Sequence, residues 1–230
     1  MYRYETHLHT SPVSRCAKFG VRQTLEFYKS LDYKGVFITN HYPDPAGVYA
    51  SMSYEERITH LFSDYENGVE IGKEIGIDVL FGVEITIGGT DFLIYGFDKQ
   101  WFLGHPEIER MSMREKLAFF MENSALVIHA HPFREAKYID HIRLFPRSIH
   151  GVEIDNACRT DFENKMAALY AESYGVLTFA GSDNHIAGKL PRLAGLEFDT
   201  PIRDEADFIE RIHNGNYQLF SRKNPCADQQ

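Results

Sequence analysis

The sequence predicts an α/β protein in which parallel strands close into a barrel. Short apolar, β-rich runs alternate with amphipathic helical segments, and this alternation is typical of βα units and a parallel sheet. Histidine and acidic residues stand at the ends of at least five strands. These ends could not all reach the single switch point of an open sheet, whereas in a barrel they surround one mouth. The placement of polar residues therefore favours the barrel.

The size and composition of the chain predict one domain over residues 1–230. A chain of 230 residues is long enough for a substantial core, and its hydrophobic share of 43% is ordinary for a globular protein. No apolar run approaches the roughly 18 residues that cross a bilayer, and the first residues show no signal-peptide pattern. Three scattered cysteines fit a reducing compartment. We therefore expect a cytoplasmic protein without a membrane partner.

The net charge of −9 argues against broad electrostatic capture of nucleic acid, which needs a basic surface. It does not exclude anionic substrates, because divalent cations held by acidic residues and histidines make a site locally positive. The charge favours small molecules over long nucleic acid.

In the first half of the chain, the residue pattern predicts strands that end in ligand-type side chains. Ser53 with Glu56 three residues later is a capping box, and Gly88-Gly89 predicts a turn. We expect strands at 2–4, 35–39, 78–85 and 91–97, and helices at 21–31 and 53–75.

The second half of the chain repeats this order. Gly175 and Gly215 are placed to end helices. We expect helices at 106–122, 161–174 and 204–213, and strands at 125–128, 151–155, 176–180, 193–198 and 217–220.

The strand ends carry the candidate metal ligands. Side chains two apart in an extended chain point to the same side, so His7 and His9 present two imidazoles to one point. Imidazoles mixed with carboxylates suit zinc, manganese or iron, and one catalytic ion takes only three or four ligands. Eight candidates therefore point to two or three divalent ions: His7, His9, His41, Glu84, His129, His131, Asp183 and His185.

Several of these residues keep an alternative role. His129 lies two residues deeper than His131, and either lines the barrel or touches metal. Asp91 begins a strand and could be a turn residue. No GxSxG, glycine-rich phosphate loop or HExxH motif is present. Cys16 and Cys158 lie in no motif that argues for a nucleophile.

Taken in order, these motifs resemble the PHP (polymerase and histidinol phosphatase) family of metal-dependent phosphoesterases. The matching pieces are ETHLHTS, ITNHYP, GVEI, VIHAHPFR and AGSDNH, which span residues 5–185. The resemblance implies a distorted (βα)7 barrel that hydrolyses phosphate esters at a trinuclear metal centre. Residues 186–230 would complete the domain.

The resemblance also implies a ligand set. One ion would be held by His7, His9, Glu84 and Asp183, a second by Glu84 and His131, and a third by His41 and His185. Many members have an Asp or His shortly after the first motif, where this chain leaves Ser14 or Cys16 in the neighbourhood. Asp91 stands where the family has a further histidine, and it could still ligate.

These inferences lead to a hypothesis about the reaction. A metal-bridging hydroxide, with Asp183 and His185 beside it, would attack the phosphorus of a small phosphate monoester in line, as in a histidinol phosphatase. Arginines balance charge on a phosphate by bidentate hydrogen bonds. The candidates for this role are Arg134, Arg159 and Arg192.

Two other functions remain open. One is a metal hydrolase of the amidohydrolase type, although no lysine stands at a strand end to serve as a carboxylated bridging ligand. The other is a non-catalytic metal-binding module. The sequence leaves the leaving group open among histidinol phosphate, a nucleotide monophosphate, a short oligonucleotide and other small esters, and it does not specify the oligomeric state.

Overall fold

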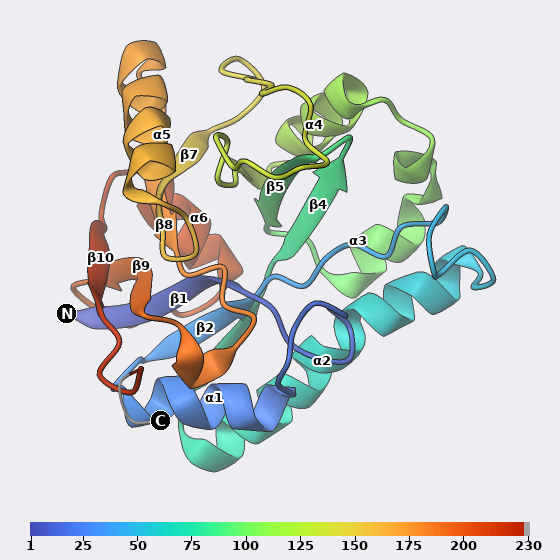
Figure 1. Ribbon diagram of the computed structural model, residues 1–230. Helices are drawn as coiled ribbons and strands as arrows, with labels where there is room; N and C mark the ends of the chain where they lie inside the picture. Colours follow the sequence, from blue (N-terminus) through green and yellow to red (C-terminus); the bar gives the residue numbers. More distant parts are fainter. Residues whose placement is uncertain (228–230) are drawn as a thin grey trace.

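The structure, a computed structural model, describes residues 1–227 and contains two five-stranded sheets with helices packed around them (Figure 1). The strand order is β10-β9-β1-β2-β3 in the first sheet and β4-β5-β6-β7-β8 in the second. Residues 228–230 of the predicted domain lie outside the described residues. The mixed α/β class predicted from the sequence is confirmed.

The first sheet is built around β1 (Tyr2–Leu8), whose residues from Tyr4 onward are all buried. It pairs in parallel with β2 (Gly35–Ile38) and antiparallel with β9 (Arg192–Phe198). Beyond these neighbours, β3 (Asp78–Phe81) pairs in parallel with β2, and β10 (Gln218–Lys223) pairs antiparallel with β9. Hence β1 holds a central place in this sheet, with a strand on either side, which agrees with the burial of its residues from Tyr4 onward.

The second sheet begins with a hairpin. β4 (Val83–Ile87) and β5 (Thr90–Tyr95) are antiparallel and joined by the predicted turn at Gly88-Gly89. β5 is also antiparallel to β6 (Leu126–His129), and the sheet continues in parallel through β7 (Gly151–Asn156) and β8 (Leu177–Gly181).

The closed seven-stranded barrel predicted from the sequence is not present in residues 1–227. The two sheets instead meet at two seams, each marked by one isolated bridge, Leu8 with Asn184 and His41 with Glu84. At the first seam His9 N–H donates to the Asn184 carbonyl (3.1 Å), and at the second Glu84 N–H donates to the Asn40 carbonyl (3.1 Å). These contacts join strand ends and form no continuous ladder, so both sheets stay open. The seams still bring the strand ends together, as the barrel hypothesis required.

The single strand predicted at 78–85 is wrong, because the chain breaks at Gly82 into β3 and β4. A Cβ atom there would lie 2.8 Å from Tyr95 Cε1 and 2.9 Å from Thr39 Cγ2, so only glycine fits without a shift of its neighbours. The break lets the chain leave the first sheet and enter the second. The break therefore places Glu84 in the second sheet, opposite His41 at the second seam.

The predicted helices follow the expected boundaries closely, with one exception, and the short helix at Lys99–Gly104 was not predicted. Ser53 caps α2 (Tyr54–Ile75) in a capping box with Glu56, as predicted. The helix predicted at 106–122 is interrupted: η1 (Pro106–Glu109) ends before Ser112, which caps α4 (Met113–Glu122) with its own capping box. The helices are α1 (Val21–Ser30), α2 (Tyr54–Ile75), α3 (Lys99–Gly104), α4 (Met113–Glu122), α5 (Asp161–Tyr174) and α6 (Glu205–His213), with a second 3-10 turn, η2, at Ala187–Lys189.

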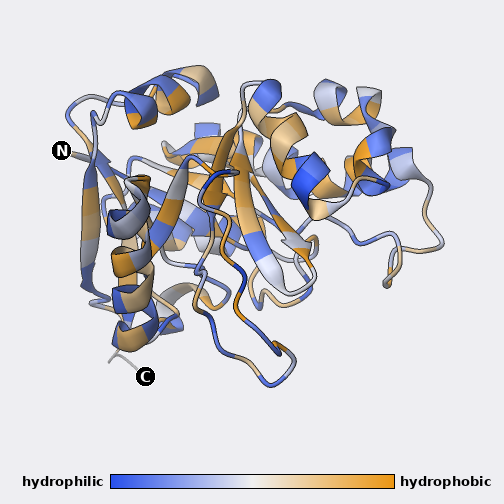
Figure 2. Ribbon diagram, turned by 90° about the horizontal axis from the view of Figure 1, so that it is seen from above, coloured by the Kyte–Doolittle hydropathy of each residue, from blue (hydrophilic) through white to orange (hydrophobic). Residues whose placement is uncertain are grey.

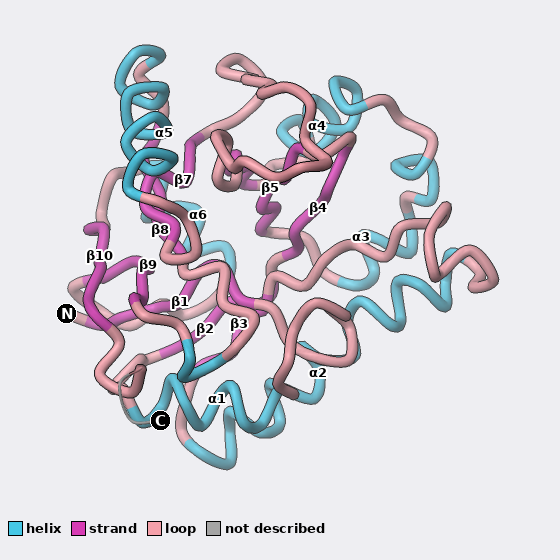
Figure 3. The backbone as a smooth tube through the Cα atoms, in the orientation of Figure 1, coloured by secondary structure: helices cyan, strands magenta, loops and turns pink. Residues whose placement is uncertain are grey.

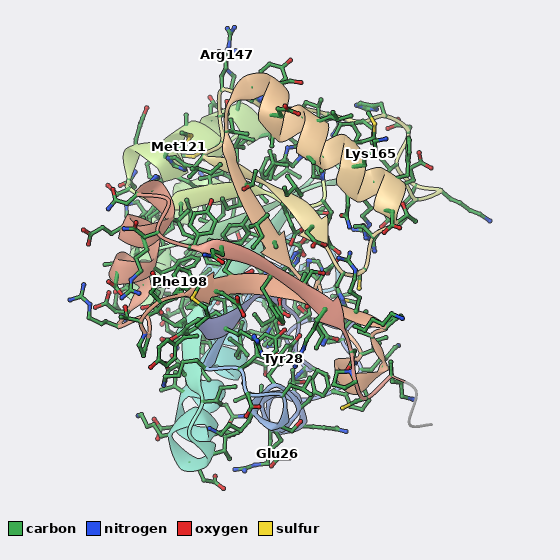
Figure 4. The ribbon with its side chains drawn as sticks, turned by 90° about the vertical axis from the view of Figure 1, so that its left-hand side faces the viewer. Glu26, Tyr28, Met121, Arg147, Lys165 and Phe198 are labelled. Atoms are coloured by element: carbon green, nitrogen blue, oxygen red, sulfur yellow. The ribbon has the colours of Figure 1, made fainter. Side chains whose placement is uncertain are left out.

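The core lies between the sheets and the helices that cover them. In Figure 2 the strands in the middle of the molecule carry most of the hydrophobic colour, whereas the helices alternate between hydrophobic and hydrophilic residues. Tyr28 of α1 points toward the first sheet and is fully buried, whereas Glu26 lies on the outer side of the same helix (Figure 4). No helix within residues 1–227 has the length and hydropathy required to span a membrane. The single domain remains a prediction.

Candidate metal centre

The candidate ligands named from the sequence converge where the two sheets meet. The loops after β1 and β8 run side by side through this region (Figure 3). Four overlapping groups each place potential ligand atoms within 4.8 Å of one another. They are His9, Cys16, His41 and His185; His7, His131 and Asp183; His7, His9 and Glu84; and Glu84, Asp91 and His131.

Glu84, on β4, lies at the centre of these groups. Its Oε1 is 3.2 Å from His131 Nε2 and 3.4 Å from His7 Nε2. Its Oε2 is 3.2 Å from His9 Nε2 and 2.9 Å from His41 Nδ1. One buried carboxylate therefore faces four imidazoles, which come from both sides of the seam.

Asp183, just after β8, faces the same imidazoles from another direction. Its Oδ1 lies 3.6 Å from His7 Nε2 and 3.5 Å from His9 Nε2, and its Oδ2 lies 3.7 Å from His131 Nε2. His185 Nδ1–H donates to the Asp183 carbonyl at 2.8 Å, which leaves His185 Nε2 available. Asp183 and Glu84 thus approach His7 and His9 from two sides.

Outer partners fix the orientation of two of the imidazoles. His7 Nδ1 lies 2.9 Å from Glu153 Oε1, and His9 Nδ1 lies 3.1 Å from Ser14 Oγ. If each Nδ1 carries the proton, both Nε2 atoms turn toward Glu84 with free lone pairs. A carboxylate or hydroxyl behind an imidazole is the usual support of a metal-binding histidine.

Glu153 is a functional candidate that the sequence reasoning missed. It lies within β7, is fully buried, and also accepts hydrogen bonds from His131 N–H (3.0 Å) and Asn156 Nδ2 (2.9 Å). The only signal was an acidic residue inside the apolar strand run GVEID. An unpaired acidic side chain is rarely fully buried, so this signal would have predicted a partner without identifying it.

Glu5 is a second missed residue, and it supports the backbone beneath His7. Its Oε1 accepts from Thr6 N–H (3.0 Å), His7 N–H (2.9 Å) and Ser182 N–H (2.8 Å), and its Oε2 accepts from Tyr28 Oη (2.7 Å). Burial raises the pKa of Glu5 to about 7, although these donors counteract the shift. Glu5 ties β1 to the loop after β8.

The electrostatics of the centre couple the buried carboxylates to the imidazoles that face them. Burial lowers the pKa of His7, but the Glu153, Asp183 and Glu84 carboxylates outweigh it and hold that pKa well above its ordinary value. Burial raises the pKa of Glu84, and the positive imidazoles of His41 and His7 hold it well below its ordinary value. The buried carboxylates therefore require positive charge beside them, which either a protonated imidazole or a bound cation can supply.

The backbone is strained where two ligand-type side chains enter the cluster. His131 and Asp183 have φ values of +27° and +54°. Such left-handed conformations cost a non-glycine residue on the order of 1–3 kcal/mol and concentrate at functional sites. Next to Asp183, a Cβ atom on Gly181 would lie 2.5 Å from His7 Cβ, so the absence of a side chain lets β8 approach β1.

Cys16 lies with the outermost imidazoles. It is exposed and belongs to the group with His9, His41 and His185. Burial raises the pKa of the thiol, but His41 and His9 outweigh it and lower that pKa. Cys158 lies apart from the groups; its Sγ donates to the Asp183 carbonyl at 3.2 Å, and burial raises its pKa to about 12.

The three predicted phosphate-binding arginines lie in three different environments. Arg134 Nη1 donates to Asp91 Oδ2 at 3.2 Å, beside the ligand groups, and Arg134 also contacts Tyr138. Arg159 has a buried Nε without a hydrogen-bond partner among residues 1–227. Arg192 is engaged by Asp155, Ser221 Oγ and the Asn156 carbonyl, so it serves to hold β9 against β7 and the neighbouring β10.

Asp91 and His129 also differ in their placement. Asp91 is buried, belongs to the group with Glu84 and His131, and lies 3.9 Å from His131 Nδ1. His129 belongs to none of the ligand groups found within residues 1–227. It stacks on Phe92 at 4.9 Å, and burial together with the positive charge of His131 lowers its pKa to about 3. It packs as a neutral aromatic ring.

The residues present fit bound divalent ions. Glu84 Oε1 is buried and has no hydrogen-bond partner among the described residues, although it points at two imidazole nitrogens. The Nε2 atoms of His7 and His9 lie only 3.2 Å apart. Converging lone pairs around an unsatisfied buried carboxylate need a cation, and this mixture of nitrogen and oxygen donors suits zinc, manganese or iron.

Comparison with known proteins supports the resemblance found in the sequence. Residues 161–217 match the family model described as PHP-associated. A search of curated protein sequences found no match.

Solved structures share the fold at low sequence identity. A two-domain protein from Bacteroides vulgatus, described as containing a PHP-like metal-dependent phosphoesterase, aligns with a TM-score of 0.65 and 14% identity over 95% of this chain and 64% of its own. A protein from Bifidobacterium adolescentis, assigned as a metal-dependent phosphoesterase, aligns with a TM-score of 0.58 and 14% identity over 91% and 95%. An amidohydrolase from Chromobacterium violaceum aligns with a TM-score of 0.57 and 12% identity over 91% and 96%.

Together these findings confirm the predicted resemblance. The chain contains a PHP-associated segment, and its fold is that of PHP-like metal-dependent phosphoesterase structures.

Proposed function

We propose that this chain of PHP-like fold is a metal-dependent phosphoesterase that hydrolyses a small phosphate monoester. The observation that carries the proposal is the position of Glu84, a buried carboxylate that faces four imidazoles and has one oxygen without a hydrogen bond among the described residues. Such a carboxylate can bridge two ions. Paired divalent ions activate a water and neutralise charge on a phosphoryl oxygen, which suits phosphate esters.

The proposed ligand sets follow the groups around Glu84. His7, His9, Glu84 and Asp183 would hold one ion. Glu84 and His131 would hold a second, with Asp91 within reach. His41 and His185 would hold a third. The identity of the metals, zinc, manganese or iron, stays open in this proposal.

The protein's own contribution is to orient these ligands before substrate arrives. Glu153 and Ser14 hold the imidazoles of His7 and His9 with Nε2 turned inward. The carbonyl of Asp183 holds the His185 imidazole in the same way. Each imidazole is then fixed in the tautomer that binds metal, so little reorganisation is needed during the reaction.

Arg134 is the best-placed of the three predicted phosphate-binding arginines. It lies on the segment between β6 and β7, which crosses in front of β4 and β5 (Figure 1). Its contact with Asp91 brings a guanidinium next to the ligand groups, where it can pair with an anionic phosphate. Arg192 is held by Asp155 and is therefore not available to a phosphate in this proposal.

The direction from which substrate enters follows from exposure. The side chains of His41 and His185 are 36% and 24% exposed, whereas those of His7 and His9 are fully buried. The cluster therefore opens to solvent on the side of the proposed third ion. A phosphate group is expected to approach from there.

The test uses metal-free protein, to which manganese, zinc or ferrous iron is added, with a generic aryl phosphate as substrate. We expect metal-dependent release of phosphate, and a loss of activity of at least about 100-fold in His9→Ala and Asp183→Ala, because each removes a direct ligand. His213→Ala, at the end of α6, is the matched histidine control and should keep full activity. Full activity in either ligand variant contradicts the proposal.

The same assay separates the second candidate, an amide-hydrolysing enzyme, which the likeness of fold to an amidohydrolase suggests. A panel of amides is tested beside the phosphate esters with the same metal-loaded protein. Hydrolysis of amides without hydrolysis of phosphate esters would favour the second candidate.

A further inference from the structure

We propose that Cys16 is a ligand of the third ion, which lies nearest to solvent and is the outer ion, whereas the other two are inner ions. The sulfur of Cys16 would make the outer site prefer a thiophilic ion such as zinc over manganese. The inference rests on the proposed metal centre, and concerns a side chain in the loop that follows β1. Its basis is the cluster of Cys16 with His9, His41 and His185, whose ligand atoms all lie within 4.8 Å of one another.

His9 is unavailable to this outer ion, because both of its ring nitrogens have other partners. Its Nδ1 lies 3.1 Å from Ser14 Oγ. Its Nε2 lies 3.2 Å from Glu84 Oε2 and 3.5 Å from Asp183 Oδ1. The His9 ring instead stacks on His185 with centroids 4.2 Å apart. The outer ion is left with Cys16, His41 and His185.

Ser14, the other residue that could complete this set, has a different role. Its hydroxyl accepts the His41 backbone N–H at 3.0 Å and contacts His9 Nδ1 at 3.1 Å. It is buried, so both contacts are made away from water. Ser14 therefore positions two histidines, and Cys16 is the remaining side chain of the loop that can ligate.

The outer set differs from the inner sets in its chemistry. The inner groups combine imidazoles with the oxygens of Glu84, Asp183 and Asp91. The outer group replaces carboxylate oxygen with sulfur. Thiolate is a soft ligand that selects zinc, whereas oxygen ligands suit manganese, so the two kinds of site should sort ions differently.

The outer set also differs in exposure. Cys16 is exposed and His41 is 36% exposed, whereas the inner ligands are buried. An ion held there exchanges with solvent more readily than the inner ions. The expected result is a protein that can carry manganese or iron inside and zinc outside.

The closeness of Cys16 and His41 has a competing explanation, in which Cys16 is a nucleophile activated by His41. The position of the imidazole argues against it, because His41 Nδ1 lies 2.9 Å from Glu84 Oε2 and belongs to the carboxylate-centred cluster. A metal that binds to the thiolate would protect it from alkylation, whereas a free nucleophile would stay reactive when the inner sites are filled.

The first experiment adds cadmium or cobalt(II) to metal-free protein and records the sulfur-to-metal charge-transfer absorption. We expect the band in the wild type and in Cys226→Ser, a cysteine outside the ligand groups, and its loss in Cys16→Ser. Cys16→Asp should restore binding of an ion without the band. A band that persists in Cys16→Ser, or that is absent from the wild type, overturns the proposal.

The second experiment measures zinc affinity and the alkylation rate of Cys16 by iodoacetamide. Loss of a residue that only hydrogen-bonds a metal ligand weakens metal binding about 10–100-fold. Loss of a ligand itself in Cys16→Ser should therefore weaken the zinc site by at least about tenfold. Zinc should slow alkylation of the wild type, and manganese should not. Equal protection by manganese, or an unchanged zinc affinity in Cys16→Ser, overturns the proposal.

These readouts need no substrate, so they separate this inference from the proposed function. A charge-transfer band in a protein that hydrolyses no phosphate ester supports the inference and refutes the function. Phosphatase activity without the band does the reverse.

Discussion

At the scale of single residues, the orientation of His7 depends on Glu153. The His7 Nδ1 contact at 2.9 Å is fully buried, so bulk water does not compete with the carboxylate for it. Glu153 also accepts from the backbone of His131, which carries another proposed ligand. One side chain thus positions two imidazoles.

Glu153→Gln should therefore weaken metal binding about 10–100-fold while leaving the fold intact, because the amide retains the shape but loses the charge that supports His7. Competition with a metal chelator measures the affinity. Glu172→Gln, an exposed position on α5, is the control. An affinity equal to that of the wild type would contradict the positioning role.

The residues themselves could be predicted from the sequence only where their spacing carried information. His7 and His9 were identifiable because alternation in a strand puts them on one side. Glu153 was not, because its partner His7 lies 146 positions away and no local pattern records that contact. His129 shares a His-x-His motif with His131, yet its ring packs on Phe92. A motif does not show which of two faces a side chain takes.

At the scale of secondary structure, the break between β3 and β4 controls where Glu84 lies. Gly82 packs against the ring of Tyr95, and its N–H donates to the Ile38 carbonyl at 3.1 Å. The chain can therefore keep its contact with β2 and still turn into the second sheet.

Gly82→Ala should destabilise the protein by about 1–3 kcal/mol, because the new methyl group would overlap Tyr95 and Thr39 in a packed interior. Urea unfolding measures the loss. Gly104→Ala, where nothing lies within 4 Å of the added Cβ atom, is the control. Equal stability of the two variants would show that the junction tolerates a side chain.

The helix α6 offers a test by pH. Burial raises the pKa of Asp207, but hydrogen bonds from Arg203 and Arg211 outweigh it and lower the pKa to about 2. Because this pKa is lower in the folded than in the unfolded protein, the ionised Asp207 stabilises the fold at pH values above 3.8, the pKa in the unfolded chain. This stabilisation is lost as the pH falls toward about 2.

Asp207→Asn should therefore cost about 1–2 kcal/mol near neutral pH, with allowance for solvent screening of the exposed Arg203. Denaturant unfolding of both proteins as a function of pH measures the difference. The difference should shrink as pH falls below about 4. If the difference in the free energy of unfolding stayed constant down to the lowest pH at which the protein folds, this explanation would be wrong.

Helices and strands with strong local signals could be predicted from the sequence. The helix predicted at 161–174 has those bounds in the structure, because Thr160 caps it and Gly175 ends it in a left-handed conformation. The strand at 78–85 could not be divided from sequence alone, since both of its halves are apolar and only the packing of Gly82 against Tyr95 separates them. Local patterns identify elements, whereas breaks inside them depend on contacts far along the chain.

At the scale of the whole molecule, the proposed ions would join the two sheets. His7 and His9 extend from the first sheet, whereas Glu84, His131 and Asp183 extend from the second. The first ion, with His7, His9, Glu84 and Asp183 as proposed ligands, would take ligands from both sheets. Hydrogen bonds at the two seams alone hold fewer strand residues than a continuous ladder would.

Removal of metal by a chelator should therefore lower the melting temperature and increase amide hydrogen exchange at the seams. A ligand at 100 times its Kd adds about 2.7 kcal/mol of stability, so the effect should be readily measured. The amides of His9 and Glu84 report on the seams, and the amides of α1 serve as an internal reference. Exchange that rises equally in both places would mean that metal stabilises the molecule without coupling its sheets.

The arrangement of the sheets could be predicted only in part. The sequence required a fold that gathers many strand ends, and a barrel was one solution. Two sheets meeting at seams are another, and the difference lies in hydrogen bonds between distant strands, such as the bridge between Leu8 and Asn184. The periodicity of each strand carries no information about such bridges.

The seams have one more consequence. Since the proposed first ion takes ligands from both sheets and the second takes its ligands from the second sheet alone, the spacing between these ions would depend on how the sheets are aligned. Thr6, whose hydroxyl contacts the Ala180 carbonyl across the first seam, fixes that alignment without touching any ligand atom. A substitution at Thr6 would then change the spacing between the ions without removing any ligand.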